Sequence, residues 1–267
     1  VHDTAQRIET NDDPQRRPEE LLNIVPTNRR QGYDARSLIR HVVDNGDFFE
    51  MRRHYASGVI TGFARLDGFS IGVIGSDPLS KAGAMDGNGA DKYAHFIDLC
   101  DTFNLPLVIF LDMPGFMLGS HAERMATMRR GARALIASAE CQVPKIEFMV
   151  RKSYGVAADA PNSIGLPKGI NLRFGWPSGE WGGIPIEGGV AAAYRREIAE
   201  AEDPDAHREN IENRLLKLRS PFRAAHKGDV VDLIDPRDTR AIAARFVRLA
   251  QPKLSELAKR EKRAVRP

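Results

Sequence analysis

The feature that most restricts the fold is an alternation of continuous apolar runs with segments of helical periodicity. Residues 107–111 are apolar throughout, as expected for a strand that is buried on both faces. Residues 122–140 then place apolar side chains at helical spacing, and residues 146–150 form a second buried-strand run. A third buried-strand candidate covers residues 171–174, where Leu172 and Phe174 alternate with polar residues. Two strand–helix–strand units in succession predict an α/β domain with at least partly parallel strands.

The segments around these units carry their own signals. Residues 34–43 predict a capped helix, and two strand-like runs at 59–66 and 69–74 flank the turn dipeptide Asp67-Gly68 of a hairpin. Further helices are predicted over 91–103, over 203–218 as a charged surface helix, and over 239–257 with Ile242, Phe246 and Leu249 facing inward. We expect residues 1–31 to be a linker with a short helix and no core, 32–258 to be the domain, and 259–267 to be a basic tail.

Charge and cysteine content exclude several classes of protein. The chain has 39 Lys and Arg against 36 Asp and Glu, a formal charge of +3, which argues against nucleic acid as the main partner. No stretch is long and apolar enough to predict a membrane span, because the best one, 104–119, is interrupted by Pro106, Asp112 and Pro114. Cys100 and Cys141 fall in helix-like apolar patterns, which favours buried core thiols and a cytoplasmic setting.

Three loops rich in glycine and other small residues follow strand-like runs: 77–88, 112–120 and 154–161. In open α/β sheets, ligands bind beyond the carboxyl ends of the strands. Small side chains let a ligand approach the backbone, and paired N–H groups can hold an oxyanion without any titratable residue. The loops therefore predict a site built on backbone amides, although each loop taken alone is also compatible with an ordinary tight turn.

The side chains themselves point to no other chemistry. There is no GxSxG elbow and no GxxxxGK[ST] loop, and the glycines around Asn88 lack the third glycine of a dinucleotide fingerprint. No histidine pair has metal-ligand spacing, so no metal is predicted, and His95 and His121 are interpreted as structural or solvated. The absence of these motifs is compatible with catalysis by backbone amides and also with a non-catalytic domain.

Eight stretches, in order along nearly the whole chain, carry a family resemblance: PEELLNIVP (18–26), YDARSLIRHVVDNGDFFE (33–50), GVITGFARLDG (58–68), PLSKAGAMD (78–86), ADKYAHFIDLCDTFNLPLVIFLDMPGFMLG (90–119), RRGARALIASAECQVPKIEFMVRKSYG (129–155), WPSGE (176–180) and DLIDPRDTR (232–240). They resemble the carboxyltransferase β subunit of biotin-dependent acyl-CoA carboxylases of the propionyl-CoA carboxylase type, in its C-terminal half. The resemblance implies a crotonase-like ββα spiral, here a single lobe.

The resemblance also implies an activity and its partners. It implies the biotin-side half of an acyl-CoA carboxyltransferase, which transfers CO2 from carboxybiotin on a carrier protein to the α carbon of a short acyl-CoA. The expected partners are the N-terminal half on the same or a separate chain, and a biotin carboxylase with its biotin carboxyl carrier, in a hexameric assembly. No metal, nucleic acid or membrane is implied.

Site residues follow from matching this sequence to the family motif. The backbone amides of Val156 and Ala157 would form the oxyanion hole, and Asp159 matches a position that helps to select the acyl chain. Six further residues would line the biotin pocket: Ala82, Gly83, Gly115, Phe116, Tyr154 and Gly155.

Three departures from the family pattern put biotin fit and acyl specificity in question. Val156 replaces a glycine, and a β-branched residue resists positive φ and crowds a ligand. Ala158 replaces an aromatic residue, and Ile184-Pro185 replaces Met-Gly, so that one backbone donor is lost. Two alternatives therefore stay open: a decarboxylase subunit for a malonyl-type CoA, and a catalytically silent scaffold. A stand-alone crotonase-type hydratase or hydrolase is the weakest interpretation, because no acid–base residue can be nominated for it.

Overall fold

One mixed β-sheet organises the chain. In this computed structural model the described residues are 4–159, 169–183, 186 and 189–260. The strands run in the order β1–β2–β3–β4–β5–β6–β8, with β7 pairing beside the end of β5. β1, β2 and β3 are antiparallel, and the pairs from β3 onward are parallel, which confirms the predicted α/β class. The strands are β1 (Phe48–Met51), β2 (Val59–Leu66), β3 (Phe69–Ser76), β4 (Leu107–Met113), β5 (Lys145–Tyr154), β6 (Asn171–Gly175), β7 (Glu180–Gly182) and β8 (Asp232–Leu233).

The predicted helices form, two of them with different bounds, and α5, α6, α7 and α9 were not predicted. The helix predicted over 91–103 begins earlier, at Gly87, because the Asp86 carboxylate caps it by accepting from the Gly89 N–H at 2.7 Å. The helix predicted over 122–140 is two helices, because Ala126 adopts a left-handed φ of 51° between them. The helices are α1 (Ala35–Val42), α2 (Gly87–Thr102), α3 (Ser120–Arg124), α4 (Thr127–Glu140), α5 (Gly155–Asp159), α6 (Gly189–Ala193), α7 (Arg195–Ala199), α8 (Pro204–Leu218), α9 (Pro221–Lys227) and α10 (Thr239–Leu257), with short 3-10 turns η1 (Glu19–Leu22), η2 (Asp44–Gly46), η3 (Lys81–Gly83) and η4 (Pro236–Asp238).

The hairpin between β2 and β3 confirms the turn predicted at Asp67-Gly68. Both residues have positive φ, 52° and 75°, the backbone of a type I′ turn. The buried Asp44 carboxylate accepts from both turn amides, at 3.1 Å from Asp67 and 2.8 Å from Gly68. A Cβ at position 68 would lie 1.9 Å from the Ile8 carbonyl oxygen, so only glycine fits there.

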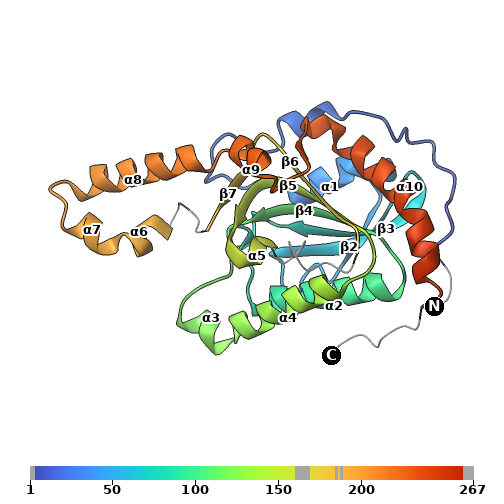
Figure 1. Ribbon diagram of the computed structural model, residues 1–267, viewed down its shortest axis with the longest axis horizontal. Helices are drawn as coiled ribbons and strands as arrows, with labels where there is room; N and C mark the ends of the chain where they lie inside the picture. Colours follow the sequence, from blue (N-terminus) through green and yellow to red (C-terminus); the bar gives the residue numbers. More distant parts are fainter. Residues whose placement is uncertain (1–3, 160–168, 184–185, 187–188, 261–267) are drawn as a thin grey trace.

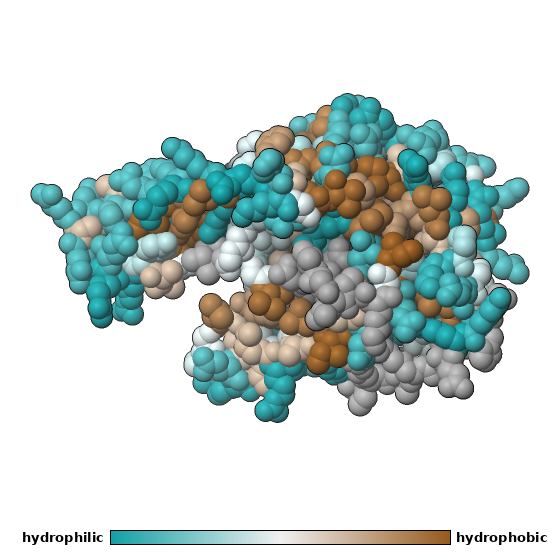
Figure 2. All heavy atoms as spheres, viewed as in Figure 1, coloured by the Kyte–Doolittle hydropathy of each residue, from teal (hydrophilic) through white to brown (hydrophobic). Residues whose placement is uncertain are grey.

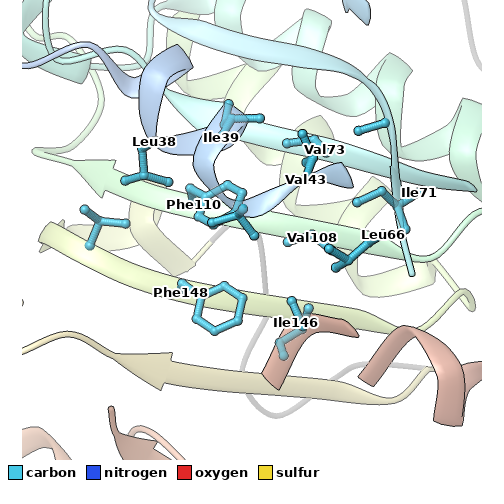
Figure 3. Packing of buried hydrophobic residues seen from close by; sticks show 14 of the residues in the cluster. Leu38, Ile39, Val43, Leu66, Ile71, Val73, Val108, Phe110, Ile146 and Phe148 are labelled. Atoms are coloured by element: carbon cyan, nitrogen blue, oxygen red, sulfur yellow. The ribbon is translucent and has the colours of Figure 1, made fainter. Parts of the chain in front are cut away.

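Apolar side chains fill both faces of the sheet. One cluster packs α1 and α10 against the sheet, and Figure 3 shows Leu38, Ile39 and Val43 lying over Phe110 and Phe148. The other cluster packs α2 and α4 on the opposite face, where Figure 1 places them, and it contains both buried cysteines. The predicted inward position of Leu249 is wrong. Its side chain is 68% exposed, because the buried face of α10 instead runs through Ala243, Val247, Ala250 and Leu254.

The N-terminal segment is part of the packed structure. The short helix expected there is η1, but the expectation that this segment contributes no core is wrong at Leu21, which is 1% exposed. Arg240 of α10 anchors the segment through hydrogen bonds made inside the protein. It is fully buried and donates to the carbonyls of Asp12 (3.1 Å) and Asp13 (2.9 Å) and to the Asp44 carboxylate (2.8 Å). A fourth bond, at 2.7 Å, goes to the Val42 carbonyl.

Three helices form an arm that projects from the sheet. Figure 1 shows α6, α7 and α8 extending to one side, and their own small cluster includes Val190 and Ile211. Figure 2 shows an open notch between this arm and the part of the body where Figure 1 places α3 and α5. No helix among the described residues has the length and apolar composition needed to cross a membrane.

Lys92 provides a prediction about stability and pH. It is 1% exposed in α2 and donates to the carbonyls of Arg52 (3.0 Å) and Tyr55 (2.9 Å). Burial lowers the pKa of Lys92 to about 8, whereas the unfolded chain keeps a pKa of about 10.4. Between these two pKa values the unfolded state binds more protons than the folded state. The free energy of unfolding therefore rises as the pH increases from about 8 to about 10, because the folded protein no longer has to bury a charged lysine.

We therefore expect the difference in unfolding free energy between wild type and Lys92→Met to grow in favour of wild type from about pH 7.5 to about pH 9.5. Urea denaturation at fixed pH values measures it. Lys259→Met, at an exposed position, is the control and should give a difference that does not vary with pH. A pH-independent difference for Lys92→Met as well would contradict the assignment.

Candidate functional site

The three predicted loops, the third as far as residue 159 where the described part ends, meet at one edge of the sheet. They follow β3, β4 and β5, which are parallel neighbours, so their carboxyl ends lie side by side. The first loop pairs with the second through Met85, whose N–H donates to the Gly115 carbonyl at 3.0 Å and whose carbonyl accepts from Met117 at 2.9 Å. A Cβ on Gly83 would lie 2.5 Å from the Asp112 carbonyl oxygen. A Cβ on Gly115 would lie 3.8 Å from the Tyr154 carbonyl oxygen, so the second loop also approaches the third.

The first loop contains unusual backbone. Lys81 and Ala82 both have left-handed φ, 51° and 53°, and Gly83 follows at 83°. Two consecutive non-glycine residues in this region are costly, and such conformations cluster at functional sites. The loop thus shows local strain at the place where the sequence predicts the pocket wall.

The turn after β5 presents the predicted amide donors. Gly155 takes a positive φ of 62°, and α5 begins at this residue. Val156 and Ala157 lie in the first turn of α5, where backbone N–H groups have no partner within the helix, and neither N–H has an acceptor among the described residues. The expectation that Val156 meets a positive-φ position is wrong, because Gly155 alone takes it. The Val156 side chain is 52% exposed, whereas Ala157 and Ala158 are buried in the core.

The Phe116 ring packs against α4. A Cβ on Gly131 of α4 would lie 2.5 Å from the Phe116 ring, so this glycine lets the ring pack directly on the helix. Phe116 and Gly115 thereby form one wall of the loop cluster, next to Gly83.

A buried ion pair underlies the loops. Asp112, at the end of β4, accepts from Arg151 Nε at 2.9 Å and from the Lys152 N–H at 3.0 Å, while its own N–H donates to Ser76 Oγ at 3.2 Å. These bonds join the ends of β3, β4 and β5, and the β4–β5 register shifts at this point. Asp112 therefore holds the ends of β4 and β5 in place relative to each other, and with them the starts of the second and third loops.

Tyr154 supports the turn from inside the protein. Its fully buried ring lies 4.8 Å from the Arg219 guanidinium, and its Oη donates to Glu180 Oε2 at 2.6 Å. Burial, together with the nearby Glu180 carboxylate, raises the pKa of Tyr154 well above its usual range, so the hydroxyl remains a donor. Arg29 donates to the same carboxylate oxygen at 2.6 Å.

The structure brings Ala82, Gly83, Gly115, Phe116 and Tyr154–Ala157 to one edge of the sheet. Asp159 ends α5, but its side chain lies outside the described residues, as do Ile184 and Pro185. Sequence reasoning did not identify Asp112, Arg219 or Arg29 as supports of the site. Glu180 stood in the quoted motif WPSGE without a role. No group of three His, Cys, Asp or Glu side chains in the described part of the chain is placed to share a metal ion.

The fold matches that of known carboxyltransferases, in sequence and in structure. Residues 2–265 match the carboxyl transferase domain, and the chain belongs to that family, as the resemblance predicted. The chain is 39% identical over 235 residues to the carboxyltransferase subunit of propionyl-CoA carboxylase from Haloferax mediterranei, covering 88% of this chain and 45% of that protein. It is 41% identical over 222 residues to the methylmalonyl-CoA carboxyltransferase 12S subunit of Propionibacterium freudenreichii subsp. shermanii, covering 83% of this chain and 42% of that protein.

A solved structure agrees in shape as well as in sequence. The transcarboxylase 12S crystal structure, described as a hexamer with methylmalonyl-coenzyme A and methylmalonic acid bound, matches with a TM-score of 0.83 and 36% identity. The match covers 99% of this chain and 49% of that one. The chain thus spans about half the length of the relatives that it matches.

Proposed function

We propose that the chain is the biotin-side half of an acyl-CoA carboxyltransferase, with a crotonase-like ββα-spiral lobe. The observation that carries the proposal is the Gly155 turn, which leaves the amides of Val156 and Ala157 without acceptors among the described residues, beside two loops of small residues. The substrate class is a short acyl-CoA, and the cofactor is carboxybiotin on a carrier protein. The relatives' names support this assignment.

In this proposal each part of the site has a physical role. The Val156 and Ala157 amides stabilise the negative charge on the ureido oxygen of biotin. Ala82, Gly83, Gly115 and Phe116 bound the pocket, and their small or packed side chains keep water out and leave the backbone accessible. Carboxybiotin, when bound, supplies the CO2 and the group that takes the α-proton of the acyl thioester. Asp159 stays a prediction for selection of the acyl chain.

The proposal includes partners. A complementary half, on the same or a separate chain, would hold acyl-CoA, and a biotin carboxylase with its biotin carboxyl carrier would supply carboxybiotin. A hexameric assembly in the cytoplasm completes the proposal, and the hexamer described for transcarboxylase 12S supports that part of it.

The test is an assay of the assembled complex. The chain, its complementary half and a biotinylated carrier should together incorporate labelled bicarbonate into acetyl-CoA or propionyl-CoA in the presence of biotin carboxylase and ATP. Omission of this chain should abolish incorporation. If a correctly assembled complex carboxylates no thioester but releases CO2 from methylmalonyl-CoA, the decarboxylase alternative holds. If it does neither, the scaffold alternative holds.

A further inference from the structure

One cavity of the structure has no lining residue from the three loops. Its volume is about 620 Å³, and it is bounded by residues 21–29, by the turn after β6 and by the junction of α8 and α9. None of the predicted amide donors or pocket residues lines it. Most of its wall is apolar, including Leu22, Val25, Trp176 and Leu216.

Two of the three arginines that line this cavity form ion pairs, and the third, Arg219, forms none among the described residues. Arg29 pairs with Glu180 at 2.6 Å, and Arg151 pairs with Asp112 at 2.9 Å. Arg219 is 7% exposed, and no carboxylate among the described residues pairs with it. Its Nη1 atom is buried without a hydrogen-bond partner, and its guanidinium group lies against Tyr154, 4.8 Å from the ring and near the hydroxyl. The cavity wall therefore holds one buried cation that lacks an anion among the described residues.

A buried charge is costly unless a counter-charge accompanies it, and no described residue supplies one by an ion pair, so the arrangement suits a bound anion. Guanidinium groups bind carboxylates through two parallel hydrogen bonds, which suits a single anionic group at Arg219. The apolar wall suits an alkyl chain, and the volume falls within the range of about 300–1,000 Å³ that is typical of small-molecule sites.

We propose that this cavity binds a small carboxylate with a short alkyl chain, whose carboxylate pairs with Arg219 and whose chain lies against Leu22, Val25 and Trp176. The cavity adjoins the carboxyltransferase site through Tyr154, but its lining includes none of the predicted pocket residues, and the proposal does not depend on the proposed function. Glu180 also lines the cavity, but it accepts from Tyr154 and Arg29 and forms no ion pair with Arg219.

Calorimetric titration of the full chain with hexanoate tests the proposal. Hexanoate should bind wild type and Arg223→Met with equal affinity, and Arg219→Met at least tenfold more weakly. Arg223 is the matched control, since it lies one turn further along the chain and is exposed. Hexylamine and inorganic phosphate should each bind wild type at least tenfold more weakly than hexanoate, because one lacks the negative charge and the other lacks the chain. Absence of hexanoate binding to wild type, equal binding to Arg219→Met, or equal binding of either probe would overturn the proposal.

A second measurement needs no variant and so stands if Arg219→Met does not fold. An alkyl carboxylate that carries a photoreactive diazirine should label wild-type peptides from 21–29, 176–180 or 216–221, and excess hexanoate should suppress the labelling. Labelling elsewhere, or labelling that hexanoate does not suppress, would overturn the proposal. Neither result bears on the carboxylation assay, so the two proposals fail separately.

Discussion

Val156→Pro should lower the turnover of the assembled carboxyltransferase about 100- to 1,000-fold while the lobe stays folded, because loss of one oxyanion donor typically has an effect of this size. Proline removes the backbone N–H that is predicted to hold the biotin oxyanion. The first turn of a helix tolerates proline, because its N–H groups have no partner within the helix. Val156 occupies such a position in α5 and is half exposed, so little packing is lost. Steady-state kinetics with propionyl-CoA and a biotinylated carrier measure the change in kcat.

Val156→Ala is the matched control for this experiment. It removes the branched side chain but keeps the amide, so its kcat should stay within a few-fold of wild type. Circular dichroism of both variants checks that the lobe is folded. Equal loss of turnover in both variants would show that the side chain, and not the amide, matters. Wild-type turnover in a folded Val156→Pro variant would remove this amide from the mechanism.

Arg240→Met should lower the free energy of unfolding by about 3–5 kcal/mol, the size expected when one partner of a buried ionic network is removed. The substitution leaves the Asp44 carboxylate without its buried counter-charge and deprives the carbonyls of Asp12, Asp13 and Val42 of their donor. Urea denaturation followed by circular dichroism measures the loss. Because none of these contacts involves the three loops, activity below the unfolding transition should be retained.

Arg237→Met is the control for that measurement. Arg237 lies only three residues earlier and also forms ion pairs, with Asp235 and Glu19, but these pairs are at the surface. Exposed pairs contribute little, so the transition midpoint should hardly move. A similar loss for both variants would indicate that burial of Arg240 is not the cause.

Much of the architecture was predictable, because burial imposes a pattern on the sequence. β4 contains an unbroken apolar run, β5 contains one interrupted only at Glu147, and Asp67-Gly68 identified the hairpin turn. The errors occurred where backbone conformation overrides periodicity. Ala126 interrupts a continuous helical pattern, and a left-handed φ cannot be predicted from an alanine, which favours the right-handed helix. Leu249 fits an apolar stripe but lies off the buried face of α10.

The candidate site was likewise predictable only in part. The three loops were visible from their small residues and their position after strands, and the structure places them together. Their supports were not visible, because Asp112 and Arg219 act through partners that are distant in the sequence, Arg151 and Tyr154, and their roles depend on tertiary contacts. The sequence predicted backbone strain at Val156 because the family has a glycine at that position. In the structure Gly155 takes the positive φ.

The buried contacts of Arg240 also bear on the order of folding. They join residues 12, 13, 42 and 44, which leave the ribosome long before α10, to that last helix of the described chain. The early strands can pair locally as a hairpin, but the part of one sheet face that α10 covers stays exposed until α10 has been synthesised. Contacts of such long sequence separation slow folding and prolong the exposure of apolar surface. During synthesis, the lobe therefore cannot complete its core before α10 emerges, and until then the nascent chain presents an apolar sheet face to chaperones.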